Sequence, residues 1–405
     1  MRLRLAGFSG MLLITMAAST ISFFALAVAS TDLQDEFGIS KLQLGLLGAI
    51  NTGVGGAFAP MSGRLADRYG GRWAMGGVLV TAGIGASVIA LAQSFGAAMV
   101  GMAIAGLPQG WGNPATNKAI SRGVAASQRG ILTGLKQSGV QLAVFTSGFA
   151  MPAISGAWGW RAGLWMAAAI SFSALLGLRL VPTLTDDEIA EVSLEQSAEQ
   201  PEEPEQTTNR ETVEPAPLPR FVYQVAIFGF LLGAVGGGLG RFLPLFAEEV
   251  AGFSVGDAGR VFGIQGLVAV PTRIASGILL DRGVSPRRMI TTMGVGGAVA
   301  VVLILLATDG SGAFLWSGTV LAGLTLGSWN TAANLSMVRE NRSAGRASGI
   351  LMIGFLAGLT FAGPAVGWSI DTFDSYTPAW LASAGFALTG AAIVSRRLDG
   401  PDRYP

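Results

Sequence analysis

The sequence predicts an all-α integral membrane protein, with twelve transmembrane helices in two pseudo-symmetric six-helix bundles. The chain has 405 residues, of which 51% are hydrophobic and only 13% charged, whereas an ordinary soluble domain is about 25% charged. Apolar runs of about 20 residues, long enough to cross a bilayer, recur along its whole length. Short motifs also repeat between the two halves of the chain.

Turn residues and charges bound the apolar runs and define the spans in order. The first run follows Arg2 and Arg4 and is longer than the core of about 7–15 residues in a signal peptide, so we expect a retained helix. The expected spans are 7–30, 42–63, 73–93, 96–120, 129–153, 160–181, 221–247, 257–280, 288–307, 312–337, 346–370 and 377–395.

The basic residues of the loops predict the orientation. If the N-terminus is cytoplasmic, nineteen arginines fall on the cytoplasmic side, and only Lys41, Arg161 and Arg260 fall outside. Cytoplasmic loops of membrane proteins carry such an excess of basic residues. We therefore expect a multi-pass protein of the plasma (inner) membrane with both termini in the cytoplasm.

An acidic segment separates the two groups of six spans. Residues 183–219 hold eleven acids and one base, so the rest of the chain carries +11 although the whole carries only +1. A segment rich in Glu, Pro, Gln and Thr cannot bury a core, so we expect a disordered cytoplasmic linker; a regulatory or partner-binding segment is the alternative. The expected bundles are 1–182 and 220–398, followed by a cytoplasmic tail at 399–405.

Two pairs of motifs indicate a duplicated six-helix unit. GRLADR at 63–68 matches GILLDR at 277–282, with an offset of 214 residues. Within 106–117, the residues Gly-Leu, Gly, Asn, Ala and Asn match those within 323–334, with an offset of 217. Six spans return the chain to the same side of the membrane, so the two units are expected to be parallel repeats.

These features resemble the major facilitator superfamily over essentially the whole chain. Its signature, Gly-x-Leu-Ala-Asp-Arg-x-Gly-Arg-Lys after the second span, stands here as GRLADRYGGR at 63–72, with a degenerate copy at 277–288. The resemblance implies the major facilitator fold and a transporter, in which Asp67 holds the N-terminus of the eleventh span while the cytoplasmic side is shut. An arginine that the family often uses for proton coupling is Gly106 here, so that role is not carried over.

The signature also has a physical reading as a conformational latch. Gly63 lets helices approach closely, and Asp67 at a helix end can satisfy free N–H groups or a cation on a neighbouring helix. An arginine cluster that only sets the topology is the alternative. The expected latch residues are Gly63, Asp67, Arg68, Gly277, Asp281 and Arg282.

The charges expected inside the membrane are all positive. Lys136, Arg241 and Arg273 lie within the fifth, seventh and eighth spans, and Lys118 lies near the inner end of the fourth, whereas every Asp and Glu falls in a loop or at a span end. An ionisable residue at membrane depth is costly unless it faces a polar cavity or a counter-charge. We therefore expect an electropositive cavity whose missing partner is an anionic substrate.

Arg273 is the strongest candidate for a substrate ligand. It precedes Asp281 by eight residues, about 12 Å along a helix, which is close to the bilayer midplane. Gln265 shares its helical face. An arginine in the eighth span also resembles the position used by anion-carrying members of the superfamily, including oxalate, monocarboxylate and nitrate carriers.

The other two cations have alternative readings. Lys136 is expected to bind the anion or close the inner gate, or else to extend to the interface. Arg241 follows a glycine-rich stretch and is expected at an outer gate or late in the pocket, or else in a pair with Glu248 or Glu249.

Two asparagine pairs at i, i+4 spacing complete the expected site. Each pair lines one helical face in the fourth or tenth span; interhelical hydrogen bonding is the alternative reading. The expected substrate-binding residues are Arg273, Lys136, Arg241, Gln265, Asn113, Asn117, Asn330 and Asn334.

The composition also limits the mechanism. The chain contains no Cys and no His, so the commonest metal ligands and proton carriers are absent, and no Gly-x-x-x-x-Gly-Lys-Ser/Thr phosphate loop occurs. We expect no catalytic residue, metal or cofactor, no nucleic-acid partner and a monomer in the lipid bilayer. The predicted function is secondary active or facilitative transport of a small, carboxylate-like organic anion by rocker-switch alternating access.

Other functions remain open at this stage. The first alternative is an efflux transporter for neutral or lipophilic compounds, and the second is a receptor or enzyme embedded in the membrane. Because few groups could carry a proton, exchange, uniport or symport with the proton on the substrate's own carboxylate is favoured.

Overall fold

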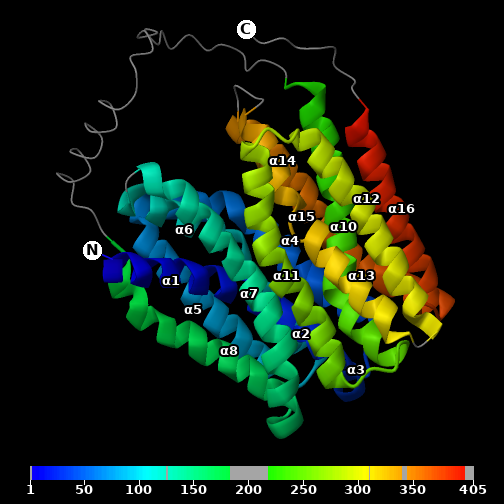
Figure 1. Cartoon of the computed structure of the whole chain (residues 1–405). Coiled ribbons are helices and arrows are strands. Elements are labelled where there is room, and N and C mark those ends of the chain that lie inside the picture. The colour runs from blue at the N-terminus through cyan, green and yellow to red at the C-terminus, as the bar shows by residue number, and fades with distance from the viewer. Residues whose placement is uncertain (1, 125, 183–217, 310, 340–343, 397–405) are drawn as a thin grey trace.

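The computed structural model describes residues 2–124, 126–182, 218–309, 311–339 and 344–396. The described residues form helices and no strand, so the all-α prediction is confirmed (Figure 1). Residues 183–217 of the predicted linker and the predicted tail at 399–405 lie outside the described residues.

The first half of the chain contains α1 (Arg2–Ala18), α2 (Ile21–Val28), α3 (Ser30–Phe37), α4 (Lys41–Tyr69), α5 (Gly71–Ala90), α6 (Phe95–Gly123), α7 (Ala126–Trp158), α8 (Trp160–Ala174) and the 3₁₀ helix η1 (Leu175–Leu180). The second half contains α10 (Arg220–Glu249), α11 (Val255–Asp281), α12 (Pro286–Leu305), the 3₁₀ helix η2 (Leu306–Asp309), α13 (Gly312–Thr325), α14 (Trp329–Arg339), α15 (Ala344–Phe373) and α16 (Thr377–Ser395).

Local sequence sets several of these boundaries. Ser40 begins α4 through a capping box in which its hydroxyl accepts from the Gln43 N–H and the Gln43 side chain accepts from the Ser40 N–H. Such reciprocal bonds satisfy N–H groups that a helix start leaves unpaired. Gly70, with φ of +87°, turns the chain between α4 and α5, a conformation that glycine adopts without strain.

All twelve predicted spans are helical within the described residues. Among the described residues, nine helices are long and apolar enough to cross a membrane, and α1 with α2, bent by 50°, meets the same length and hydropathy requirement as a pair. The remaining two spans are α6, which carries Gln109, Asn113, Asn117 and Lys118, and the broken pair α13 and α14. The predicted fourth and tenth spans, which carry the asparagine pairs, are therefore not among the helices that meet this requirement.

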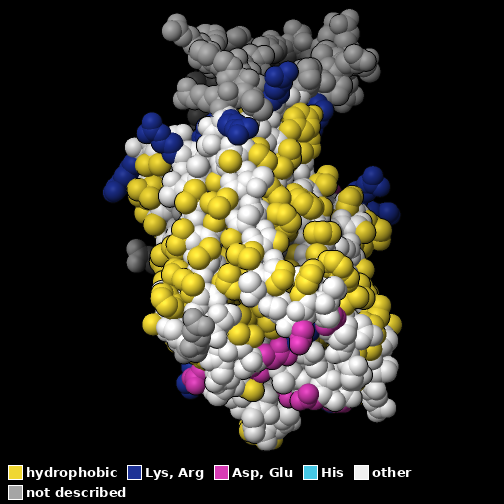
Figure 2. Space-filling view, turned by 90° about the vertical axis from the view of Figure 1, so that its right-hand side faces the viewer, with side chains coloured by type: hydrophobic (Ala, Val, Ile, Leu, Met, Phe, Trp, Pro, Cys, Tyr) yellow, Lys and Arg dark blue, Asp and Glu magenta, His cyan; other side chains and the backbone are white. Residues whose placement is uncertain are grey.

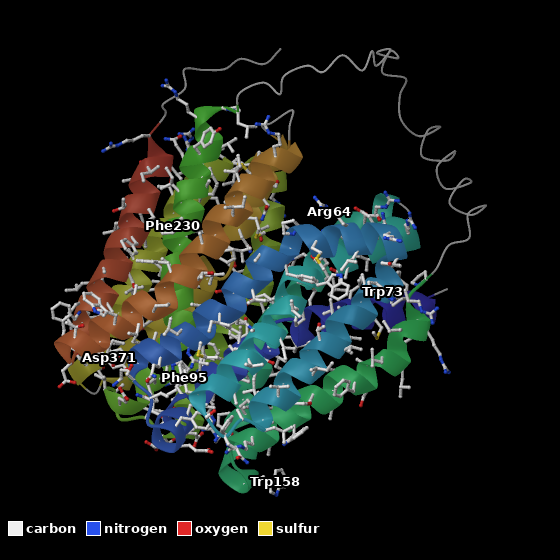
Figure 3. The ribbon with its side chains drawn as sticks, turned by 180° about the vertical axis from the view of Figure 1, so that it is seen from behind. Arg64, Trp73, Phe95, Trp158, Phe230 and Asp371 are labelled. Carbon is white, nitrogen blue, oxygen red and sulfur yellow. The ribbon has the colours of Figure 1, made fainter. Side chains whose placement is uncertain are left out.

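The surface distinguishes the two ends of the molecule. Figure 2 shows a hydrophobic belt between Lys and Arg side chains gathered at the top and Asp and Glu side chains gathered toward the bottom. We call these the arginine-rich end and the acidic end. Arg64, near the end of α4, and Asp371, near the end of α15, mark the two ends in Figure 3.

Two seams join the halves, α4 against α15 and α7 against α11. Toward the acidic end both seams are tight: a Cβ on Gly45 would overlap the backbone of Gly363, and a Cβ on Gly148 would overlap the backbone of Gly259. Glycine permits this approach because a side chain would force the helices apart.

Toward the arginine-rich end the same four helices are not packed in this way. A Cβ on Gly63 of α4, Gly134 of α7, Gly277 of α11 or Gly349 of α15 would meet no atom within 4 Å. In Figure 1 the two groups of helices diverge toward this end, at the top. The halves are therefore closed together at the acidic end and separated at the arginine-rich end.

Candidate functional site

Lys136 of α7 is buried among polar side chains of α6. It is 1% exposed, and its ammonium donates hydrogen bonds to Asn117 Oδ1 at 2.6 Å, Thr116 Oγ1 at 3.0 Å and Asn113 Oδ1 at 3.1 Å. The i, i+4 spacing of the two asparagines directs both toward the same lysine. Lys136 therefore has a full set of acceptors, but all of them are neutral.

Gln137 links Lys136 to Arg273 in the other half. Its Nε2 donates to Asn113 Oδ1 at 2.9 Å, and its backbone oxygen accepts from Arg273 Nη1 at 3.5 Å. The Arg273 side chain lies on α11, so the network crosses the seam between α7 and α11. Lys136, Asn113, Asn117 and Arg273 were predicted site residues, and the structure brings these four together.

A break in the tenth span anchors Arg273. Helix α13 ends at Thr325 and α14 begins at Trp329, and the carbonyl of the intervening Gly327 accepts from Arg273 Nε at 2.7 Å. A carbonyl at a helix break lacks the partner that a continuous helix supplies. Arg273 satisfies this carbonyl and remains only partly buried.

The cluster of Lys136 and Arg273 carries uncompensated positive charge. The ion pairs formed within the described part of the chain are Lys41–Glu249, Lys118–Asp67, Arg161–Glu36 and Arg260–Asp257. Within the described part of the chain, no group of three or more acidic, His or Cys residues is placed to hold a metal ion. The arrangement suits an anion, because a cation would be repelled and a neutral molecule would leave both charges unbalanced.

Arg241 lies apart from this cluster. Its Nε donates to the Leu44 carbonyl of α4 at 3.0 Å, and the side chain is 1% exposed. The alternative pairing with Glu248 or Glu249 is not formed: Glu248 accepts from Thr31 at 2.6 Å, and Glu249 pairs with Lys41 at 3.0 Å. Arg241 therefore crosses between the halves near the acidic end.

The remaining predicted site residues make different contacts. Asn334 Nδ2 donates to the carbonyl of Asn330 in its own helix at 2.9 Å, so this pair does not repeat the arrangement of Asn113 and Asn117. The backbone of Gln265 packs against Gly323, where a Cβ would lie 2.8 Å from the Gln265 oxygen. Gln265, Asn330 and Asn334 are each partly buried.

Two members of the cluster, Gln137 and Thr116, were not predicted as site residues from the sequence. Gln137 directly follows Lys136, and Thr116 lies three residues after Asn113, on the same helical face. The helical spacing indicated Thr116 as a neighbour of the asparagine pair. Gln137 had no such signal, because its side chain turns toward Asn113 through tertiary packing.

The predicted latch is not engaged across the halves in this structure. Asp67, whose side chain is 72% exposed, pairs at 2.7 Å with Lys118 of its own half. Arg282 is also exposed, and the side chain of Asp281 lies outside the described residues. This agrees with the separation of the helices at the arginine-rich end.

A second network holds the acidic end closed. The Asp371 carboxylate of α15 accepts from the backbone N–H groups of Lys41 and Leu42, at 3.1 and 2.8 Å. A carboxylate at a helix start is favourable because it satisfies free N–H groups and faces the positive end of the helix dipole. Tyr376, whose pKa is raised by burial and by the Glu249 charge, donates to Glu249 at 2.7 Å.

A pocket of about 300 Å³ lies within this network. Its lining includes Lys41, Glu249, Asp374, Tyr376 and Thr377. Two of these residues already pair with each other, so the pocket is part of the closure at the acidic end.

A family model described as Major Facilitator Superfamily matches residues 11–355. The hexuronate transporter of Bacillus subtilis (strain 168) is 24% identical over 390 residues, covering 92% of this chain and 89% of that protein.

Two solved structures share the fold. One is a bacterial homologue of the human lysosomal transporter Spinster, in an inward-facing and unoccupied conformation, with a TM-score of 0.70, 15% identity and coverage of 96% of this chain and 94% of that one. The other is a mutant of the nucleoside transporter NupG, with a TM-score of 0.71, 13% identity and coverage of 96% and 98%.

Proposed function

Because the chain belongs to the major facilitator superfamily of multi-pass membrane transporters, we propose that it carries a small organic anion by alternating access. The observation that carries the proposal is the cluster of Lys136 and Arg273, which joins the two halves through Gln137 and has only neutral partners. A substrate carboxylate would supply the missing charge to both cations.

A sugar acid fits the polar groups around these cations. It presents one carboxylate and several hydroxyls, and the cluster offers amide and hydroxyl groups from Asn113, Asn117, Thr116 and Gln137. Such groups donate and accept hydrogen bonds with a polyol. The hexuronate transporter relative supports this substrate class.

We further propose that the arginine-rich end faces the cytoplasm in the inner membrane, with both termini on that side. The excess of arginine at that end supports this orientation through the positive-inside rule. The structure would then be the inward-facing state, in which the cation cluster binds or releases solute on the cytoplasmic side. The proposed function requires no catalytic step by this chain.

A binding panel tests the substrate class. The purified protein is titrated with glucuronate, with oxalate and succinate, with glucose as the neutral counterpart of glucuronate, and with a lipophilic cation. Thermal stability is expected to rise with at least one carboxylate and not with glucose or the cation. Stabilisation confined to neutral or lipophilic compounds would refute the anion proposal and favour efflux of such compounds.

Substitution of Arg273 tests the site. We expect Arg273→Gln to lower carboxylate uptake into proteoliposomes about 30-fold or more, because a lost charged hydrogen bond costs about 2–4 kcal/mol. Arg260→Gln is the matched control, because Arg260 lies on the same helix but is exposed and paired with Asp257. Equal uptake by both variants would remove Arg273 from the site.

A further inference from the structure

We infer that Arg241 is a second anion-binding residue, which takes the carboxylate of the solute only when the acidic end is open. This inference rests on the proposed function and deepens it. It adds an entry site that lies nearer the acidic end than Lys136 and Arg273.

The guanidinium of Arg241 is buried and incompletely bonded. Its Nε donates to the Leu44 carbonyl at 3.0 Å. Among the residues that the structure describes, Nη1 and Nη2 are both buried and neither has a hydrogen-bond partner. A guanidinium carries five N–H donors, four of them on these two nitrogens, so most of its bonding capacity is unused in the closed arrangement.

The nearby carboxylates do not compensate this charge. Glu248 accepts from Thr31 of the other half, and Glu249 is bonded by Lys41 and Tyr376. Removing a charge from water without a partner is unfavourable. The burial of Arg241 therefore opposes the tight glycine packing of the closed seam and favours its opening.

The location of Arg241 determines what it meets after opening. It lies eight residues before Glu249, about 12 Å along α10 from the acidic end. Its partner Leu44 is the fourth residue of α4. The Cδ of Arg241 lies 3.9 Å from the position that a Cβ on Gly48 would take. Separation of α4 from the second half would therefore uncover the guanidinium between the two halves.

The chemistry of the free nitrogens specifies a carboxylate. The two Nη groups form a planar fork that matches a carboxylate in bidentate geometry. A neutral solute would leave the charge uncompensated. A carboxylate entering from the acidic end would bind Arg241 first and reach Lys136 and Arg273 deeper in the molecule.

The test compares Arg241→Gln in forms that are closed and open at the acidic end. Thr52 Oγ1 of α4 and Thr360 Oγ1 of α15 lie 2.9 Å apart across the seam, within reach of a disulfide after both are changed to Cys. The chain has no native Cys, so oxidation of Thr52→Cys with Thr360→Cys gives a closed form without competition from native thiols. Loss of transport on oxidation and its recovery on reduction verify the cross-link.

Two single changes supply the open form. Asp371→Asn removes the carboxylate that caps α4, and Gly45→Ala forces α4 away from Gly363. Thr52, which is 1% exposed, serves as the reporter: Thr52→Cys alone should react faster with an external maleimide as the seam opens. Of Asp371→Asn and Gly45→Ala, the change that makes Thr52→Cys react faster with maleimide is used as the open form in the binding measurements.

The ligand is whichever carboxylate of the binding panel (glucuronate, oxalate or succinate) binds the unmodified protein most tightly. Its Kd is measured for each variant in the open and in the cross-linked form. Arg241→Gln is expected to weaken binding at least tenfold more in the open form than in the cross-linked form. Arg241→Lys, which keeps the charge but loses the fork, should weaken it less. Arg260→Gln, another arginine near the acidic end, is the control for loss of one positive charge.

The outcomes separate this inference from the proposed function. Equal weakening in both forms, or none in either, would overturn the role of Arg241, while the carboxylate site at Lys136 and Arg273 would stand. If no carboxylate in the panel binds the unmodified protein, the proposed function fails and the inference falls with it.

Discussion

Asn113 is the acceptor shared by the two side chains at the centre of the site. Lys136 Nζ donates to its Oδ1 at 3.1 Å and Gln137 Nε2 donates to the same atom at 2.9 Å. Because Gln137 also contacts Arg273 through its backbone oxygen, Asn113 is connected to both cations through hydrogen bonds. Its role would be positioning as well as contact with a solute.

Loss of this acceptor is therefore expected to weaken substrate binding. Asn113→Ala leaves a buried ammonium with one acceptor fewer, a change that costs about 1–3 kcal/mol, and we expect the Kd for a carboxylate to rise about tenfold. Asn334→Ala is the control, because within the described part of the chain the Asn334 side chain bonds only to Asn330 of its own helix. Isothermal titration of both variants provides the measurement, and equal affinities would contradict the positioning role.

Glu36 gives a second prediction at this scale, on pH dependence. The hydrogen bonds from Arg161 lower the pKa of Glu36, with a further contribution from Trp160. A lowered pKa means that the pair stabilises the fold above the pKa of the unfolded chain, and that this stability is lost as pH falls through the folded value.

The melting temperature of the unmodified protein should thus fall more steeply between about pH 5 and pH 3 than that of Glu36→Gln. Because the pair is partly exposed, Glu36→Gln should cost only about 0.5–1 kcal/mol at pH 6. Asp35→Asn, a change on the same helix at an exposed residue, is the control. Parallel pH profiles for all three proteins would refute the contribution of the pair.

Part of the site was predictable from sequence. Membrane depth selected Lys136 and Arg273, and helical spacing selected Asn113 and Asn117. The acceptors of Arg241 and Arg273, by contrast, are backbone carbonyls of Leu44 and Gly327. A backbone carbonyl leaves no mark in the residue sequence, so these contacts depend on how the helices pack.

At the scale of the helices, apolar length and turn residues were enough to place the twelve spans. The break between α13 and α14 was not predicted, because its residues Leu326, Gly327 and Ser328 lie inside one continuous apolar segment. That break provides the carbonyl that Arg273 uses. The polar residues Asn113, Thr116 and Asn117 of α6 are accounted for by their hydrogen bonds with Lys136.

Glycines in α4 give a prediction for this element. Gly45→Ala places a methyl group against the backbone of Gly363, whereas Gly63→Ala on the same helix meets no atom within 4 Å. We expect the Gly45 variant to open the acidic end and to lower the thermal stability by about 1–3 kcal/mol through overpacking. Gly63→Ala should be neutral or stabilising by up to about 1 kcal/mol, because alanine favours a helix.

Maleimide labelling of Thr52→Cys, together with thermal unfolding, checks both variants. The Gly45→Ala background should label faster, and the Gly63→Ala background should label no faster than the unmodified protein. Equal labelling would mean that close glycine contact does not hold this end shut.

At the scale of the whole molecule, the two ends of the α4–α15 pair have corresponding carboxylates. These helices run antiparallel, so Asp371 near the end of α15 reaches the start of α4. Asp67 lies near the end of α4, at the other end of the same pair, and pairs with Lys118 here. The resemblance to the family gives Asp67 the reciprocal contact with the start of α15 when that end closes. Asp67 was predicted from the sequence as a latch residue, whereas Asp371 was not, because its acceptor role depends on backbone N–H groups of another helix.

Substituting the two carboxylates should therefore shift the molecule in opposite directions. Asp371→Asn removes a stabilising contact of the structure described here and should favour opening at the acidic end, whereas Asp67→Asn should favour the arrangement described here. Each change is expected to alter the ratio of the two states by about two- to thirty-fold, the equivalent of about 0.5–2 kcal/mol for a lost cap. Labelling of Thr52→Cys should rise in the first variant and fall in the second.

The double variant provides the decisive comparison. Because a transport cycle requires both states, each single change should slow uptake, and the two together should return labelling toward the unmodified rate if their effects oppose each other. Carboxylate binding should persist in all three variants, since neither aspartate contacts the cation cluster in this structure. Labelling that rises with both single changes would show that Asp67 and Asp371 act independently, and would contradict a reciprocal latch.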